Sequence, residues 1–367
     1  MRALIVGGIC AALFVMPAAA RILVVNANGY TLNAKGEVKR FDRLQIGDDG
    51  RIEATYERGD KLPKGLKLDK QIEAGGKTLI PGLIDSHANI MAIGLNALNA
   101  DLSSAGTLEA ALDKVRAEAV RDKHSAWIEG AGWNPLRLGL GRLPTAADLD
   151  RAITDRPVAL TRSDGEALWV NSRALAIAGI NRGVSDPAGG HIERGGTGQP
   201  RRLLAGTAMG LVRRHVPPPH PRKAEAALAR ALSILASAGI TMAHDDGTSP
   251  EAWTLYRRFG DERRLTIRIY AMADGPQALA SIAPVKPTPW LYDDRLVMRA
   301  VTFTSDGALG TRGAWLLHPY SDAPAPRGVG LIDDTRLRNL LSRALMDGFQ
   351  PVVRAGGDGA NRQLPAA

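Results

Sequence analysis

The sequence predicts a mixed α/β protein built on a parallel sheet, either a barrel or a doubly wound sheet. In the second half of the chain, amphipathic helical patterns alternate with short apolar runs that end in polar residues. One example runs from Leu228 through Gly239 to Asp246. Helix, glycine, strand and polar tip together are typical of βα units. The carboxyl ends of strands in such sheets carry functional residues.

The first part of the chain predicts a cleavable signal peptide over residues 1–20. Arg2 gives a positive start, residues 3–15 are uncharged and apolar, and residues 17–20 are small, as cleavage requires. The apolar run is too short to span a bilayer, and the alternative is a buried N-terminal element. We therefore expect a periplasmic or secreted protein with no membrane association beyond export. Cys10, the single cysteine, would leave with this peptide, so the mature chain would contain no disulfide.

Residues 21–80 predict a small N-terminal β-layer. Residues 44–46 lead through the turn-rich residues 47–50 into residues 51–54, which is the pattern of a hairpin. Residues 81–367 then carry the α/β pattern. Strands are expected at the four runs that precede polar tips: 79–84, 240–243, 265–273 and 296–303, with a further one at 351–353.

Helical faces are expected where apolar residues recur at helical spacing. They comprise Leu108, Ala111, Leu112, Val115 and Ala119; Leu228, Ala231, Leu232 and Leu235; and Leu337, Leu340, Leu341, Ala344 and Leu345.

The stretch from about 94 to 221 is longer than a normal crossover and predicts a large inserted cap. Its three tryptophans, Trp127, Trp133 and Trp169, would line a substrate pocket or pack in the core of the insert.

The basic balance of the chain does not predict a nucleic-acid partner. The formal net charge is +9, but lysine and arginine are spread along the chain rather than gathered on one helix or arm. The densest group, between residues 201 and 223, is expected on a solvated surface, with an anionic partner as the alternative.

Three polar residues follow predicted strands and are candidates for chemistry. A metal-dependent hydrolase needs neutral imidazoles and carboxylates at the mouth of its barrel, where they hold a cation that activates water. His87, His244 and Asp306 are the candidate residues for such a site. The alternatives are a hydrogen-bonded pocket role for His87 and a structural role for His244. Asp245 and Asp306 would then cap helices or turns.

The order of several motifs carries a resemblance to a known family. The motifs are Pro-Gly-Leu-Ile-Asp-Ser-His at 81–87, Gly-Ala-Gly-Trp-Asn at 130–134, Leu-Pro-Thr-Ala-Ala-Asp-Leu-Asp at 143–150, Trp-Val-Asn-Ser at 169–172 and Asp-Gly-Ala-Leu-Gly-Thr-Arg-Gly-Ala at 306–314. From residue 22 to 363 the chain resembles the metal-dependent amidohydrolase superfamily, in the branch of the N-substituted formamide deformylases and the YtcJ-like proteins.

This resemblance implies an incomplete (β/α)8 TIM-type barrel with an N-terminal β-layer and a large inserted cap. It also implies zinc or another divalent metal, a small amide-like substrate and hydrolysis of a non-peptide C–N bond in an amide or formamide. By the same resemblance His87 is the candidate metal ligand, and His244 and Asp306 are the candidate catalytic residues.

The chain departs from the family pattern at four polar positions. The family has His-x-His after the first strand, whereas this chain has His87 and then Asn89. Thr302 stands at the position of a lysine that the resemblance implies can bridge metals, and Arg354 stands at that of a further histidine ligand. Glu166 replaces a histidine expected to face substrate. A guanidinium is permanently cationic and repels a divalent metal.

The resemblance also implies further barrel strands after Ala367, with another metal histidine and an aspartate that shuttles protons. We therefore expect an impaired or inactive hydrolase, possessing a metal only if His87 finds new partners such as Glu166, His244 or Asp306. The alternative is a non-catalytic degenerate homologue, a fragment or a binding relic. The spatial neighbours of His87 decide between an impaired hydrolase and a non-catalytic homologue. The sequence specifies neither the substrate nor the oligomeric state.

Overall fold

The computed structural model describes residues 21–195, 200–321 and 328–364. The chain divides into two compact units, of which the first ends at Gly82 and the second begins at Leu83. The predicted signal peptide, with Cys10, lies outside the described residues. Within the described ranges, none of the helices combines the length and hydropathy needed to cross a bilayer.

The first unit consists of two small β-sheets. The four-stranded sheet has the order β5-β4-β1-β6, and the three-stranded sheet has the order β3-β2-β7. The strands are β1 (Ile22–Val25), β2 (Asn28–Leu32), β3 (Val38–Phe41), β4 (Arg43–Ile46), β5 (Ile52–Tyr56), β6 (Lys70–Glu73) and β7 (Thr78–Leu79). The predicted hairpin is confirmed, because β4 and β5 pair antiparallel and the Gly47 amide donates to the Arg51 carbonyl at 2.8 Å.

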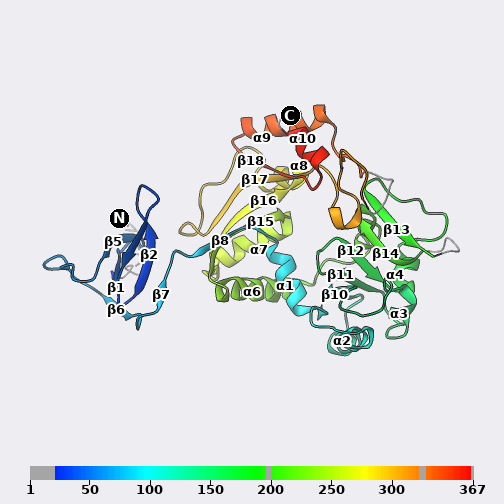
Figure 1. The fold of residues 1–367 in the computed structure, drawn as a ribbon, viewed down its shortest axis with the longest axis horizontal. Coiled ribbons are helices and arrows are strands. Elements are labelled where there is room, and N and C mark those ends of the chain that lie inside the picture. The colour runs from blue at the N-terminus through cyan, green and yellow to red at the C-terminus, as the bar shows by residue number, and fades with distance from the viewer. Residues whose placement is uncertain (1–20, 196–199, 322–327, 365–367) are drawn as a thin grey trace, which may run out of the picture. The chain divides into compact units, whose positions relative to one another are not determined.

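The second unit contains a five-stranded parallel sheet with the order β18-β17-β16-β15-β8. Its strands are β8 (Leu83–Ala88), β15 (Ile240–Thr248), β16 (Arg268–Asp274), β17 (Leu296–Thr304) and β18 (Gln350–Arg354). From β15 onward, strands consecutive in the sequence are neighbours, and every pair is parallel. The order does not reverse, as it does in a doubly wound sheet. The predicted α/β fold is therefore confirmed, with the sheet as a half-barrel (Figure 1).

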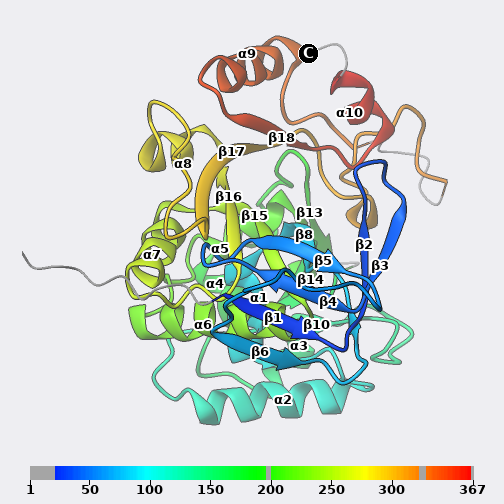
Figure 2. The same ribbon diagram turned by 90° about the vertical axis from the view of Figure 1, so that its left-hand side faces the viewer.

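Helices connect and cover these strands. They are α1 (Ile90–Leu98), α6 (Pro221–Ser237), α7 (Pro250–Asp261), α8 (Gly275–Ile282), α9 (Asp334–Met346) and α10 (Asp358–Gln363). Figure 2 turns the same sheet by 90° and shows α9 beside β18. The expected buried face of α6 is confirmed, and its leucines share one core with Tyr256 and Phe259 of α7. On α9 the expectation is wrong at Leu345, which is 62% exposed. The buried residues of this helix are Leu337 and Ala344.

A second, mixed sheet lies between β8 and β15 in the sequence and has the order β13-β14-β12-β11-β10-β9. Its strands are β9 (Ala100–Asp101), β10 (Ile128–Trp133), β11 (Val158–Arg162), β12 (Ala167–Val170), β13 (Gly190–Arg194) and β14 (Pro200–Gly206). Its helices are α2 (Leu108–Arg121), α3 (Ala146–Asp150), α4 (Ser172–Ile177), the 3-10 turn η1 (Thr207–Met209) and α5 (Gly210–Arg213). The expected buried face of α2 is confirmed at every predicted position. A second 3-10 turn, η2 (Leu309–Thr311), follows β17.

The tryptophans of this region pack in its core. Trp133 and Trp169 are fully buried and meet edge to face, with ring centroids 5.8 Å apart. Their indole N–H groups donate to the carbonyls of Leu160 and Thr145, at 2.8 and 2.7 Å. Trp127 is also buried. Because all three rings are buried and the N–H groups of Trp133 and Trp169 have backbone partners, core packing is the outcome for these tryptophans.

Helices α1 and α6 approach each other at a glycine. A Cβ atom at Gly94 would lie 1.9 Å from the carbonyl oxygen of Ala227. We predict that Gly94→Ala separates the two helices and lowers the free energy of unfolding by about 1–3 kcal/mol, as measured by urea denaturation. Gly106→Ala is the control, because a Cβ there meets nothing within 4 Å. Equal urea midpoints for the two variants would contradict the close approach.

The start of α3 is held by an ionised carboxylate. Asp148 forms a capping box with Thr145 and accepts two hydrogen bonds from Arg142, both at 2.8 Å. Burial raises the pKa of Asp148, but the hydrogen bonds from Arg142 and Thr145 outweigh it and lower the pKa from 3.8 to about 2.

We predict that Asp148→Asn lowers the free energy of unfolding by about 2 kcal/mol at pH 7. A depressed folded-state pKa contributes stability that is complete above the unfolded pKa near 3.8 and is lost as pH falls toward 2. The difference between wild type and variant should therefore shrink between pH 5 and pH 3 in urea titrations. A difference that stays constant over this range would show that the carboxylate charge is not its origin.

Candidate functional site

The site forms around Asp246, near the carboxyl end of β15. This side chain is 1% exposed. Its Oδ2 accepts a hydrogen bond from Arg354 Nε at 2.6 Å and lies 3.1 Å from His87 Nε2. Its Oδ1 accepts from Thr302 Oγ1 at 2.7 Å. Three of the positions singled out in the sequence therefore converge on one carboxylate.

The charges around this carboxylate keep it ionised. Burial alone raises the pKa of Asp246, but the hydrogen bonds from Arg354 and Thr302, with the positive charges of Arg354 and His87, outweigh burial and lower the pKa. The imidazole of His87 is itself exposed, at 71% of its side chain. The arrangement is thus a buried anion held by a guanidinium, a hydroxyl and an exposed imidazole.

Asp245, the preceding residue, faces the helices instead. Its Oδ1 accepts from the backbone amide of Ile90 at 2.8 Å, and its Oδ2 accepts from Thr248 Oγ1 and Tyr256 Oη at 2.7 and 2.9 Å. Burial raises the pKa of Asp245 and raises that of Tyr256 well above its usual value. Ile90 begins α1. Asp245 therefore ties the start of α1 to α7, in agreement with the capping alternative.

Asn89 also serves the start of α1. It is the N-cap residue, and its Oδ1 accepts from the amide of Ala92 at 2.9 Å. An asparagine is among the best N-cap residues, because its side-chain oxygen satisfies a free amide of the first turn. Asn89, which stands where the family has a second histidine, thus caps a helix in this chain.

His244 lies on the same face of β15 as Asp246, because alternate residues of a strand share a face. Its ring stacks on that of Tyr270, with centroids 4.6 Å apart and planes 26° apart. Burial lowers the pKa of His244, and the charge of Asp85 partly offsets this. The neutral imidazole therefore predominates near pH 7. Its catalytic role stays a prediction.

Asp306 is occupied by backbone amides. Its Oδ2 accepts from the amides of Trp315 and Gly357, at 2.7 and 2.8 Å, and its Oδ1 accepts from that of Gly356 at 2.8 Å. The side chain is buried. It therefore joins the loop after β18 to the loop that contains Trp315, and its catalytic role also stays a prediction.

Glu166 lies in a separate group of charges within electrostatic range of Arg354. Burial raises the pKa of Glu166, and Asp164 raises it further, while Arg162, Arg213 and Arg354 lower it. The imidazole of His87 pairs with Asp246 rather than with Glu166, His244 or Asp306. The partner of the His87 imidazole is therefore a different residue from the three that were expected to complete a remodelled metal site.

The residues present do not fit a divalent cation. Within residues 21–195, 200–321 and 328–364, no three histidine, cysteine, aspartate or glutamate side chains are grouped so that they could hold a metal ion. The carboxylate of Asp246 contacts the imidazole of His87 and the hydroxyl of Thr302, and the guanidinium of Arg354 already binds it. A divalent cation would have to displace this fixed positive charge.

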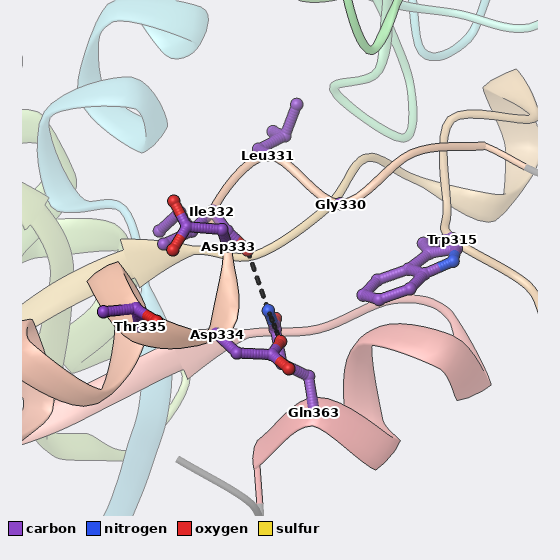
Figure 3. A pocket seen from close by; sticks show the side chains of 8 residues that line it. All are labelled: Trp315, Gly330, Leu331, Ile332, Asp333, Asp334, Thr335 and Gln363. Atoms are coloured by element: carbon purple, nitrogen blue, oxygen red, sulfur yellow. Dashed lines mark hydrogen bonds between the residues drawn. The ribbon is translucent and has the colours of Figure 1, made fainter.

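A hollow of about 550 Å³ lies elsewhere in the second unit (Figure 3). Its lining residues are Trp315, Gly330, Leu331, Ile332, Asp333, Asp334, Thr335 and Gln363. Gln363 Nε2 donates to the carbonyl of Ile332 and to Asp334 Oδ1, both at 2.8 Å, and Asp333 caps α9. These polar groups are used in holding α9 and α10 together, and none of the predicted site residues lines the hollow.

The central residue of the site, Asp246, was not among the residues predicted to act. The sequence contained a signal for it. In a strand that extends to Thr248, positions 244 and 246 share a face and position 245 faces the other way. The strand expected over 240–243 is shorter than the observed strand, which continues to Thr248 and includes both aspartates.

The comparisons with known proteins agree with this fold. The model of the amidohydrolase family matches residues 70–367. The chain is 30% identical to the Bacillus subtilis protein YtcJ over 336 residues, which are 90% of this chain and 62% of that protein. It is 26% identical to the N-substituted formamide deformylase of Arthrobacter pascens over 194 residues, covering 52% of this chain and 35% of that enzyme.

A solved structure of an uncharacterized metal-dependent hydrolase from Pyrococcus horikoshii has the same fold, with a TM-score of 0.70 at 20% identity. That match covers 94% of this chain and 67% of the other. The chain belongs to the amidohydrolase family. It spans less than two thirds of the length of the two named relatives from Bacillus subtilis and Arthrobacter pascens.

The contact between Tyr256 and Asp245 gives a stability prediction. Tyr256→Phe removes the donor to a buried carboxylate, and we expect the free energy of unfolding to fall by about 1–3 kcal/mol. Tyr270→Phe is a matched control, because its hydroxyl donates to the exposed Gln350 and its ring remains stacked on His244. Thermal unfolding of both variants measures the difference. A loss for Tyr270→Phe as large as that for Tyr256→Phe would contradict the role given to Asp245.

Proposed function

We propose that this protein is an amidohydrolase-family member whose capacity to hydrolyse non-peptide C–N bonds, as in amides and formamides, is impaired or lost. Family membership and the name of the Arthrobacter pascens relative support the reaction class. In that reaction water would give its hydroxyl to the carbonyl carbon and a proton to the leaving amine. A divalent metal would supply the activated water in such a site.

The observation that carries the impairment is the ion pair between Arg354 Nε and Asp246 Oδ2 at 2.6 Å. Asp246 is the carboxylate that pairs with the imidazole of His87, the predicted metal ligand. Its two oxygens are taken by Arg354 and Thr302 as well as by His87. A cation at Asp246 would therefore compete with groups that already bind both oxygens of this carboxylate.

Release of formate from an N-substituted formamide tests this proposal. The purified chain is assayed with excess Zn²⁺, Mn²⁺ or Co²⁺, and again with EDTA. We expect formate release at the level of the His87→Ala variant in every case, with less than about a tenth of an equivalent of zinc retained after dialysis.

His124→Ala is the control for non-specific damage. Turnover that EDTA abolishes, and that His87→Ala loses while His124→Ala keeps, would disprove the impairment and restore a working hydrolase.

A further inference from the structure

We propose that Arg354 acts as a built-in cation that cross-links the half-barrel through Asp246, in the place where a bound metal would otherwise join the strands. This inference rests on the proposed function in one respect, namely that the site holds no catalytic metal.

The cross-link spans the whole sheet. In the order β18-β17-β16-β15-β8, Asp246 lies on β15, His87 on the outermost strand β8 and Arg354 on the outermost strand at the other side. Thr302 lies on β17, between them. One carboxylate thus receives a group from each outer strand and one from an inner strand.

The contact requires a curled sheet. Neighbouring strands lie about 4.8 Å apart, so the three steps from β15 to β18 amount to about 14 Å in a flat sheet. Strand pairing also places Asp246 level with Met272, Ala300 and then Gln350, four residues before Arg354. Side chains stand roughly perpendicular to a sheet. The guanidinium and the carboxylate therefore meet at 2.6 Å only because the strands curl toward this face.

The buried end of the pair makes the cross-link strong. Asp246 is 1% exposed, whereas the side chain of Arg354 is 42% exposed. If the guanidinium is removed, a buried carboxylate loses its partner, which costs far more than losing a pair at the surface. The pair between Arg343 Nε and Asp347 Oδ2 has the same 2.6 Å distance, but its arginine is 72% exposed. It is therefore a matched control with the same atoms and a different environment.

The first experiment measures unfolding in urea with EDTA present, so that no metal contributes. We expect Arg354→Met to raise the equilibrium constant for unfolding roughly a hundredfold. Arg343→Met should raise it less than about fivefold. The double variant Asp246→Leu/Arg354→Met should recover most of the loss, because no buried charge is left unpaired. An unfolding constant for Arg354→Met within fivefold of wild type, or a double variant no more stable than Arg354→Met, would overturn the proposal.

The second experiment tests whether the guanidinium of Arg354 occupies the position where a divalent metal would bind. Arg354→His removes the fixed charge and adds an imidazole beside His87 and Asp246. We expect Zn²⁺ to raise the urea midpoint of this variant and to bind it at least about a hundredfold more tightly than it binds wild type. His87→Ala in the same background should abolish the gain. Equal Zn²⁺ affinity of wild type and Arg354→His would overturn the proposal.

The two proposals fail in different ways. Metal-dependent formate release by wild type disproves the proposed function, whereas the unfolding constants measured with EDTA do not depend on any hydrolysis. If Arg354→Met is as stable as wild type while formate release stays at background, the cross-link is wrong and the impairment stands.

Discussion

The half-barrel depends on the compensation of one buried negative charge. Burying an isolated carboxylate is costly unless it is paired and hydrogen-bonded. Asp246 meets this requirement with donors from three other strands, so the strands cannot separate at this end without exposing or unpairing the charge. The same contacts that keep the carboxylate ionised therefore also fix the curvature of the sheet. Because these contacts use both oxygens of Asp246, the carboxylate is not free to bind a metal.

Two adjacent aspartates of β15 bind different groups on opposite faces of the sheet. Asp246 lies on the concave face and pairs with His87 and Arg354. Asp245 faces the helices and binds the start of α1 and the hydroxyl of Tyr256. The alternation of a β-strand makes this division possible, since neighbouring side chains point to opposite faces. A shift of one residue in the register of β15 would exchange the two environments and disrupt both.

The departures from the family pattern form a consistent set in the structure. Asn89 caps α1, Thr302 donates to Asp246, and Arg354 pairs with it. Each of these three side chains has a hydrogen-bond partner and a structural role. The chain thus belongs to the amidohydrolase family, while the side chains at these three altered positions are bonded to its own groups.

The sequence by itself determined the α/β class, the hairpin of the first unit, the buried faces of α2 and α6 and the family. All of these follow from local periodicity or from motifs in a fixed order. It also identified His87, Thr302 and Arg354 as altered or retained ligand positions. It did not reveal that they meet at Asp246, nor that Asp306 binds backbone amides and Trp133 and Trp169 lie in a core. Those outcomes depend on how far a sheet curls and on which distant loops it brings together. Contacts between residues that lie far apart in the sequence leave no periodic trace in the chain.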